Sequence, residues 1–205
     1  MTTIVVIAKE TIPGKVKTRL HPALTYEQAA ELAAASLADT LAVAAAMPAA
    51  RRILCFDGNQ LPLGSELFEV VPQVSGDLGM RLAAIFDECS GPTVLIGMDT
   101  PQLTAEMLAP VFDEWTTDAY LGFANDGGFW MLGLAEPDGS LILGIPMSKD
   151  DTGQQQLERL TRRGLSVTLL PELTDVDTIA DARAVAALAP ASNFGRTFES
   201  FGARS

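Results

Sequence analysis

The sequence predicts an α/β protein: a single domain with a mostly parallel sheet flanked by helices. Short apolar runs, such as residues 4–7 and 93–98, are typical of buried strands. These runs alternate with longer segments of helical periodicity, and such alternation is typical of a parallel sheet. The chain has 205 residues, of which 48% are hydrophobic and 20% charged, so it can bury a real core.

The elements can be placed in order along the chain. We expect strands at residues 3–8, 52–56, 67–71, 93–98, 119–124, 129–134 and 166–170, and helices at 26–47, 78–89, 104–115, 152–163 and 177–188. Thr25 and Thr104 suit N-caps, and Gly164 suits a helix C-terminus. The strands at 119–124 and 129–134 are too close for a helical crossover, which predicts a small antiparallel insertion. We expect one domain over residues 1–189 and a loose tail over 190–205.

A cationic segment directly follows the first expected strand. Three of the four lysines, Lys9, Lys15 and Lys17, fall within nine residues, and Arg19 follows them, although the formal net charge of the chain is -12. Backbone N–H groups around Gly14 and these side chains can converge on phosphate groups. We therefore predict a phosphate-binding loop. The alternative is a solvated loop in which the lysines cluster by chance.

Acidic residues follow other strands at the same expected edge of the sheet. Asp99 comes directly after the strand at 93–98 and is followed by Thr100, while Asp175 and Asp177 precede the last helix. Carboxylates in this place suit a Mg²⁺ or Mn²⁺ ion that bridges a diphosphate. The alternatives are a turn that uses Asp99 and a helix cap provided by Asp177 or Thr178.

Two glycine-containing segments complete the candidate site. Asp126-Gly127-Gly128 joins two expected strands. It is either a plain hairpin turn or a place where the backbone approaches a ligand while Asp126 holds a hydroxyl group. Gly76-Asp77-Leu78-Gly79 opens the helix expected at 78–89. It can cradle a base or a phosphate, and Asp77 can also cap the helix.

Composition excludes several classes of protein. His21 is the only histidine, so a histidine-based triad or a histidine-rich metal site is excluded. The strong negative charge argues against a nucleic-acid partner. Cys55 and Cys89 have no paired spacing, and the N-terminus lacks the features of a signal peptide. No apolar run approaches the length of a membrane span; residues 27–46 come nearest, but Glu27, Glu31 and Asp39 interrupt them. We therefore expect a cytoplasmic protein without membrane contact.

Taken together, the motifs resemble one family. They are residues 13–20, 76–79, 97–103, 126–134 and 175–178. In this order the chain resembles the glycosyltransferase-A-like bacterial family labelled arsenosugar-biosynthesis glycosyltransferase, which is related to the nucleotide-diphospho-sugar transferases. The resemblance extends to about residue 188. It implies a nucleotide-binding transferase domain over residues 1–189 with a divalent cation, Mg²⁺ or Mn²⁺.

The resemblance also implies roles for particular residues. Lys15, Lys17 and Arg19 would hold phosphates, Asp99 would bind the metal ion, and Asp126 and Asp177 would lie near the acceptor or at a second metal position. From the residue patterns and the resemblance together, we expect phosphate or nucleotide binding by Lys9, Gly14, Lys15, Lys17, Arg19, Gly76, Asp77 and Gly79; substrate binding by Thr100, Asp126, Gly127 and Gly128; metal binding by Asp99, Asp175 and Asp177; and catalysis by Asp99 and Asp126. One departure stands out. Many glycosyltransferases of this fold carry two acids spaced by one residue after the central strand, whereas Gly97 stands two residues before Asp99.

Three functions remain open at this point. The first is metal-dependent transfer of a sugar from a nucleotide to a small-molecule acceptor. The second is nucleotidyl transfer with release of pyrophosphate, because phospholactate guanylyltransferases share the Lys-Thr-Arg-Leu and Asp-Val-Asp-Thr segments with this chain. The third is a non-catalytic nucleotide-binding module. The sequence leaves the oligomeric state undetermined.

Overall fold

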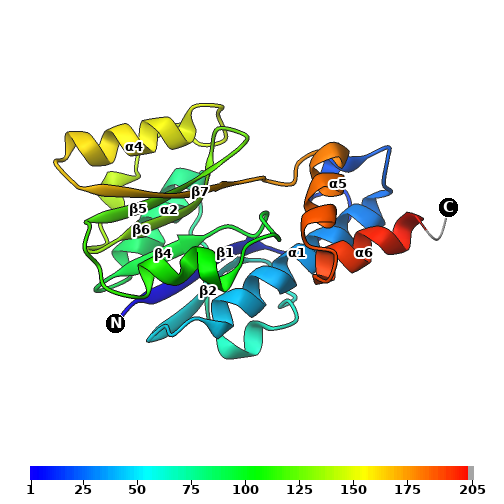
Figure 1. Cartoon of the computed structure of the whole chain (residues 1–205), viewed down its shortest axis with the longest axis horizontal. Coiled ribbons are helices and arrows are strands. Elements are labelled where there is room, and N and C mark those ends of the chain that lie inside the picture. The colour runs from blue at the N-terminus through cyan, green and yellow to red at the C-terminus, as the bar shows by residue number, and fades with distance from the viewer. Residues whose placement is uncertain (203–205) are drawn as a thin grey trace.

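A seven-stranded sheet with helices on both faces forms the centre of the computed structural model, which describes residues 1–202 (Figure 1). The strands are β1 (Thr3–Lys9), β2 (Arg51–Asp57), β3 (Glu69–Pro72), β4 (Thr93–Ile96), β5 (Ala119–Ala124), β6 (Phe129–Leu134) and β7 (Val167–Leu173). Their order in the sheet is β3-β2-β1-β4-β6-β5-β7. Strand β6 is antiparallel to β4 and β5, and the other neighbouring strands are parallel. The predicted fold class, including the antiparallel insertion, is confirmed.

Most helices begin where the sequence places their caps. The helices are α1 (Tyr26–Ala46), α2 (Leu78–Asp87), α3 (Ala105–Leu108), α4 (Thr152–Arg162), α5 (Ile179–Leu188) and α6 (Asn193–Gly202). Thr25 forms a capping box with Gln28 at the start of α1, and the Asp77 carboxylate accepts the backbone N–H of Met80 at the start of α2. Gly164, in the left-handed conformation at φ 79°, follows the end of α4.

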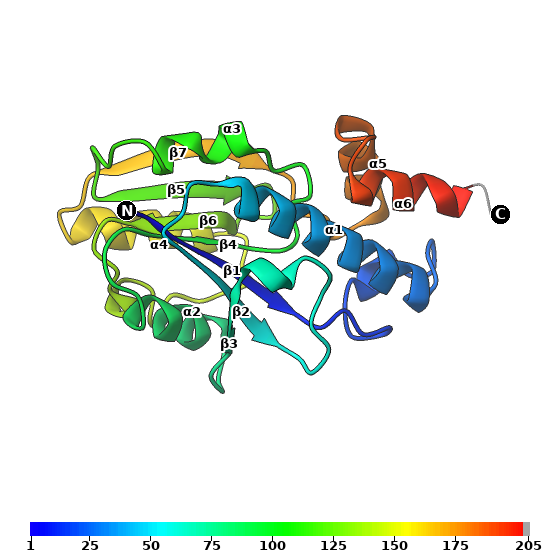
Figure 2. The same cartoon turned by 90° about the horizontal axis from the view of Figure 1, so that it is seen from below.

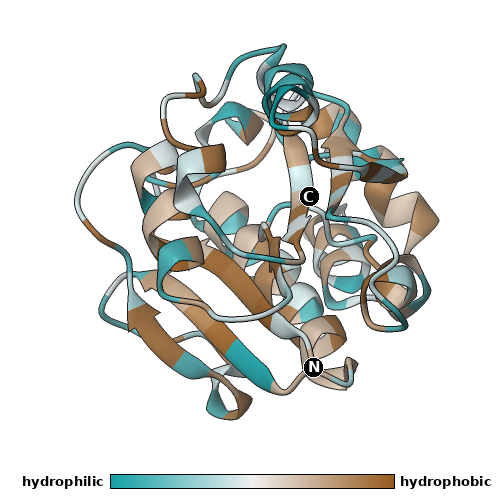
Figure 3. Ribbon diagram, turned by 90° about the vertical axis from the view of Figure 1, so that its left-hand side faces the viewer, coloured by the Kyte–Doolittle hydropathy of each residue, from teal (hydrophilic) through white to brown (hydrophobic). Residues whose placement is uncertain are grey.

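The two faces of the sheet have separate hydrophobic cores. Ile4 and Val6 of β1 pack under α1 and α3, whereas Val5 packs with α2 and α4 on the opposite face. This alternation is the two-residue period of a strand. Figure 2 shows α1 lying across the sheet, and in Figure 3 the central strands are mostly hydrophobic while many of the loops are hydrophilic. Burial of both faces leaves the ends of the strands as the accessible part of the sheet.

The helix expected at residues 104–115 is much shorter than predicted. Thr104 caps α3 as expected, but α3 ends at Leu108 and a 3₁₀ turn, Ala109–Val111, follows. Pro110 explains the difference. Proline has no N–H to donate and its ring clashes with the preceding turn, so the apolar periodicity of this segment does not continue as an α-helix.

The loose tail expected over residues 190–205 is also wrong for residues 193–202, which form α6. Phe194 and Phe201 are buried in a third core between α1, α5 and α6. Asp39 of α1 accepts the backbone N–H groups of Asn193 at 2.9 Å and Phe194 at 2.8 Å, which caps the new helix. Figure 1 shows α5 and α6 beside the first half of α1, away from the sheet. Residues 203–205 of the expected tail lie outside the described part of the chain.

Helix α1 meets the length and hydropathy that a membrane span requires, which differs from the sequence-based expectation. Length and composition alone are weak evidence, because a core helix passes the same test. In this structure 56% of the relevant 18-residue window is buried within the protein. Leu37 and Leu41 pack on the sheet, and Ala29 and Leu32 pack in the core shared with α5 and α6. The apolar composition of α1 is thus explained by burial on two sides.

Candidate functional site

A cavity of about 710 Å³ opens at the edge of the sheet where β1, β4, β5 and β7 end. Ligand sites of open α/β sheets lie at this edge. The expected residues that line the cavity are Lys9, Lys15, Lys17, Arg19, Asp99, Thr100, Asp126, Gly128, Asp175 and Asp177. The expected residues that shape adjacent loops without lining the cavity are Gly14, Gly76, Asp77, Gly79 and Gly127.

Lys17 lies at the centre of the acidic part of this site. Its ammonium nitrogen Nζ contacts one carboxylate oxygen of each of three aspartates: Oδ1 of Asp99 at 2.8 Å, of Asp175 at 3.3 Å and of Asp177 at 3.2 Å. The Lys17 side chain is only 8% exposed, and its backbone has the left-handed conformation, with φ 45° and ψ 38°. Few non-glycine residues adopt this conformation, and such residues are enriched at functional sites.

The charges of this cluster shift two pKa values. Burial by itself lowers the pKa of Lys17, but the nearby charges of Asp99 and Asp175 outweigh it and hold the pKa well above its usual range. Burial raises the pKa of Asp175 to about 7, and the neighbouring Asp99, Asp177 and Asp126 add to this rise against the opposing effect of Lys17. One ammonium group pairs with three carboxylates, so Asp175, the most buried of the three, is the least favourable to ionise.

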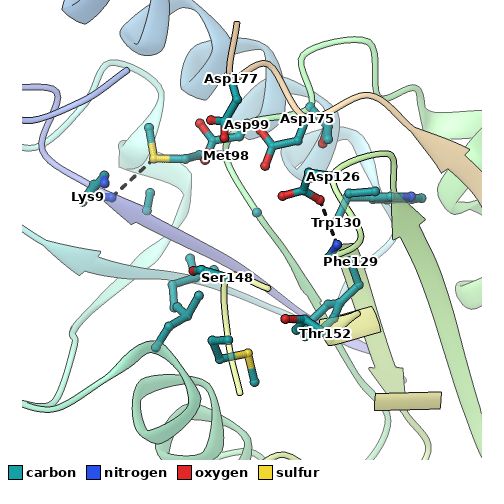
Figure 4. Close-up of a pocket in the computed structure, with 18 of the residues that line it drawn as sticks. Lys9, Met98, Asp99, Asp126, Phe129, Trp130, Ser148, Thr152, Asp175 and Asp177 are labelled. Carbon is teal, nitrogen blue, oxygen red and sulfur yellow. Dashed lines mark hydrogen bonds between the residues drawn. The ribbon is translucent and has the colours of Figure 1, made fainter. Parts of the chain in front are cut away.

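Hydrogen bonds hold the loop after β7 against the residues that follow β4 and β5. The N–H of Val176 donates to the carbonyl oxygen of Asp99 at 3.1 Å, and the N–H of Asp175 donates to Asn125 Oδ1 at 2.9 Å. Thr178, not Asp177, caps α5, through a capping box with Asp181. The Asp177 carboxylate pairs with Lys17 and with the Arg19 guanidinium group. Figure 4 shows Asp99, Asp175 and Asp177 gathered at one side of the cavity.

The carboxylates have the chemistry of a magnesium or manganese site but are not arranged as a preformed one. Among residues 1–202, no group of three histidine, cysteine, aspartate or glutamate side chains could hold a metal ion in this structure. The Lys17 ammonium group lies between the three candidate ligands. Mg²⁺ commonly binds through one or two carboxylates plus substrate phosphates. These residues therefore fit an ion that binds together with a phosphate-bearing ligand.

The turn between β5 and β6 packs tightly against a segment that sequence reasoning missed. Four residues separate the two strands, so the turn is longer than a two-residue hairpin. Gly127 has φ 87°, and a Cβ atom there would lie 1.9 Å from the carbonyl oxygen of Asp150. The N–H of Gly153 donates to the carbonyl oxygen of Gly127 at 2.8 Å. Asp126, whose Oδ1 accepts the N–H of Gly128 at 2.8 Å, is thereby positioned at the cavity.

The two aromatic residues that follow this turn both line the cavity, but they are buried to different degrees. Trp130 is buried and donates its indole N–H to the carbonyl oxygen of Pro171 at 3.0 Å. A Cβ atom on Gly122 would collide with the Trp130 ring, so the absence of that side chain makes space for the tryptophan. Phe129 is half-buried and lines the cavity. Trp130 therefore packs into the hydrophobic core, whereas Phe129 keeps more of its ring available to a ligand.

Several lining residues were not predicted. Among them are Gln73 and Arg81 near α2, Met147, Ser148, Lys149 and Asp150 before α4, and Thr152 at its start. Gln73 donates to the carbonyl oxygens of Ala8 at 2.8 Å and Cys55 at 3.1 Å, and accepts from Arg81 at 3.1 Å. Arg81 and Lys149 did carry a signal: Arg81 ends the glycine-containing stretch at 76–81, and Lys149 is the one lysine outside the basic loop. No local pattern marks Gln73.

Fold and site together define an α/β protein of the nucleotide-diphospho-sugar transferase-like fold. The chain belongs to the family described as "Uncharacterized protein conserved in bacteria (DUF2064)", whose model matches residues 30–149. The match starts inside α1 and ends at Lys149. The basic loop and the Asp175–Asp177 segment therefore lie outside the matched residues.

Solved structures extend the similarity to nearly the whole chain. A protein from Desulfovibrio desulfuricans G20, provisionally named a nucleotide-diphospho-sugar transferase, has a TM-score of 0.87 and 26% identity, over 98% of this chain and 95% of that one. The 2-C-methyl-D-erythritol 4-phosphate cytidylyltransferase of Thermus thermophilus has a TM-score of 0.56 and 15% identity, over 92% and 99% of the two chains.

A CMP:2-keto-3-deoxy-manno-octonic acid synthetase in complex with CTP has a TM-score of 0.51 and 13% identity, over 91% of this chain and 97% of that one. At such identities, this enzyme and the Thermus cytidylyltransferase show a shared fold. A comparison with curated proteins finds no match.

Proposed function

We propose that this protein is a transferase that takes a sugar from a nucleotide donor and passes it to a small-molecule acceptor. One observation carries the proposal. The cavity at the carboxyl edge of the sheet places cations from the loop after β1 opposite aspartates that follow β4, β5 and β7. The D. desulfuricans protein, whose name includes the same class of activity, shares the fold over 98% of this chain. The finer arsenosugar-type assignment stays a prediction.

The basic loop would hold the phosphates of the donor. Within residues 1–202, the ammonium groups of Lys9 and Lys15 make no ion pair, although both residues line the cavity and are exposed. Unpaired cations at the edge of such a sheet are suited to phosphate oxygens, which accept charge-assisted hydrogen bonds. Arg19 and Lys17 add positive charge while they also tie the loop to Asp177.

Asp99, Asp175 and Asp177 would hold a Mg²⁺ or Mn²⁺ ion that is bound to the donor phosphates. Such an ion, when bound, supplies positive charge that stabilises a leaving diphosphate. Asp126 would accept the proton of the acceptor hydroxyl group, because it is exposed at the cavity and only one of its oxygens is occupied by the N–H of Gly128. Phe129 would pack against an apolar face of the sugar or of the acceptor.

Nucleotidyl transfer is the second candidate, because the same cradle also suits a triphosphate. An oxygen of a phosphorylated acceptor would bond to the α-phosphorus while the α–β bridging bond breaks and its electrons leave on pyrophosphate. The two cytidylyltransferase-type structures described above share the fold over more than nine-tenths of the chain. The two reactions differ in their products, nucleoside diphosphate in the first case and pyrophosphate in the second.

A thermal-shift panel tests both candidates. Nucleoside triphosphates and nucleotide sugars are each added with and without Mg²⁺ or Mn²⁺, because a ligand that binds only the folded protein raises the Tm. A metal-dependent shift with one nucleotide sugar supports sugar transfer, and a shift with a triphosphate alone supports nucleotidyl transfer. Binding without turnover of any acceptor would support the non-catalytic module. No shift with any compound would refute a nucleotide site.

The variant Asp99→Asn tests the metal assignment in the same panel. Asn keeps the size of the side chain but removes the charge that a divalent cation needs. We expect the metal-dependent part of the nucleotide shift to disappear while the protein stays folded. An unchanged metal-dependent shift would show that Asp99 does not hold the ion. Thr104→Ser, a conservative change at the cap of α3, is a control that leaves the site intact.

A further inference from the structure

The distribution of lysine in this chain indicates a second anion-binding position. All four lysines of the protein line this same cavity, although the chain has a net charge of -12 and 26 acidic residues. Lys9, Lys15 and Lys17 come from the end of β1 and the loop after it, whereas Lys149 comes from the connection between β6 and α4. The proposed donor phosphates account for the first three lysines and not for Lys149.

Lys149 belongs to a different wall of the cavity from the basic loop. Figure 4 shows Ser148 and Thr152 across the cavity from Asp99 and Asp177, with Asp126 between the two groups. Ser148 lines the cavity, as Lys149 does. A ligand that contacts this wall and a ligand held by the basic loop would therefore meet near Asp126, the residue proposed to accept the acceptor proton.

The segment that carries Lys149 is held in place by specific contacts. The backbone N–H of Lys149 donates to Thr152 Oγ1 at 3.0 Å, and this hydroxyl donates to the carbonyl oxygen of Pro146 at 2.8 Å. Ser148 has φ 58°, a left-handed conformation that is costly for serine. The turn around Gly127 packs directly on Asp150. These contacts fix the backbone of Lys149 beside the turn that carries Asp126.

The Lys149 side chain is nevertheless available for a ligand. It is exposed, and in the described part of the chain its ammonium group makes no ion pair, although Asp150 and Asp151 follow it directly. The ammonium group of Lys17, by contrast, already forms ion pairs with three carboxylates. An unpaired ammonium group on a residue that lines a cavity in a strongly acidic protein favours an anionic ligand.

We propose that Lys149 binds an anionic group, a phosphate or a carboxylate, of the acceptor substrate. This inference rests on the proposed function and names the chemical class of its second substrate. It holds for both candidate reactions, because in each the acceptor occupies the side of the cavity opposite the donor phosphates. With its anionic group at Lys149, an acceptor extends toward Asp126 and the donor.

The test is a calorimetric titration of the folded protein after saturation with the nucleotide that gives the largest shift in the panel. The probes are inorganic phosphate and acetate, which represent the two possible anionic groups. The variants are Lys149→Ala, Lys149→Arg and Lys15→Ala, the last being a matched exposed lysine from the opposite wall. We expect Lys149→Ala to weaken anion binding about tenfold or more, the value of one charge-assisted contact, while nucleotide affinity stays within about twofold.

Lys149→Arg should retain the anion, and Lys15→Ala should weaken the nucleotide instead. Stronger binding of phosphate than of acetate would indicate a phosphorylated acceptor, and the reverse a carboxylic acid. The inference is overturned if wild-type protein with bound nucleotide binds neither probe, or if Lys149→Ala leaves anion binding unchanged. It is also overturned if Lys149→Ala weakens the nucleotide as much as Lys15→Ala does, because Lys149 would then belong to the donor site. If wild-type protein binds no nucleotide, the proposed function itself fails, and this inference with it.

Discussion

Lys17→Met should destabilise the folded protein strongly, even though it removes one charge from a loop. Methionine keeps the length of the side chain and removes the ammonium group. That group lies within 3.3 Å of carboxylate oxygens of Asp99, Asp175 and Asp177. Without it, three carboxylates face one another in a partly buried space with no countercharge. Their mutual repulsion and incomplete solvation then oppose folding.

The size of the effect follows from the burial of the four groups. Removing one partner of a buried ion pair costs about 3–5 kcal/mol. The Lys17 side chain is 8% exposed, but the carboxylates are 24–36% exposed, so water screens part of the repulsion. We therefore expect a loss of about 2–3 kcal/mol in the free energy of unfolding. For a chain of this length that corresponds to a decrease of about 5–10 °C in Tm.

Urea denaturation and thermal unfolding at pH 8, in the presence of a chelator, measure the loss. Lys15→Met is the matched control, because Lys15 is exposed in the same loop, makes no ion pair within residues 1–202, and carries the same charge. We expect that control to change stability by less than about 0.5 kcal/mol. Added Mg²⁺ should raise the Tm of Lys17→Met more than that of the wild type, since a hard cation can replace the ammonium group. Equal stabilities of the two variants would refute Lys17 as the countercharge of the cluster.

Three further outcomes follow from the structure. Gly127→Ala should lower the free energy of unfolding by more than about 2 kcal/mol, because the new Cβ would collide with the adjacent loop and φ at this position is 87°. The control is Gly144→Ala, which has φ 83° but open space around it and should lower the free energy of unfolding by about 1 kcal/mol in the same urea titration. Asp39→Ala should lower the free energy of unfolding by about 1–2 kcal/mol and speed amide hydrogen exchange at the start of α6, because the carboxylate that accepts the N–H of Phe194 is lost. Unchanged amide exchange there would contradict this role. Asp175 has a folded-state pKa raised to about 7, so the folded state holds its proton more tightly than the unfolded chain does. Its contribution to stability is complete below the unfolded pKa of about 4 and is lost as pH rises toward 7. The metal-free protein should therefore lose stability over this window relative to Asp175→Asn, and parallel pH profiles of the two proteins would exclude the shift.

Much of the fold could be predicted because its signals are local. The apolar runs at β1 and β4 and the caps at Thr25 and Asp77 depend on residues within a few positions of one another. The two failures are of a different kind. Pro110 overrides an apolar periodicity that suggested a longer helix. Helix α6 is stabilised by burial of its aromatic residues against α5 and α1, and α1 lies far away in the sequence.

The candidate site shows the same division. The cationic loop after β1 and the aspartate after β4 could be found because they interrupt an otherwise clear pattern of strands and helices. The segment of Ser148 and Lys149 was missed, since nothing nearby in the sequence relates it to the turn around Gly127. Gln73 was missed for a similar reason: its role is to bond the carbonyl oxygens of two neighbouring strands, which become neighbours only in the folded sheet.

The sequence by itself determined the alternation of strands and helices, the position of the basic loop and the strand ends at which the aspartates stand. Only the tertiary structure decided how these parts meet. The order of strands brings Lys17 to Asp175, 158 residues further along the chain, and the left-handed backbone at Lys17 turns its side chain into the carboxylates. Local propensity acts over a few residues, whereas contacts at such separations depend on which strands pair and which faces become buried.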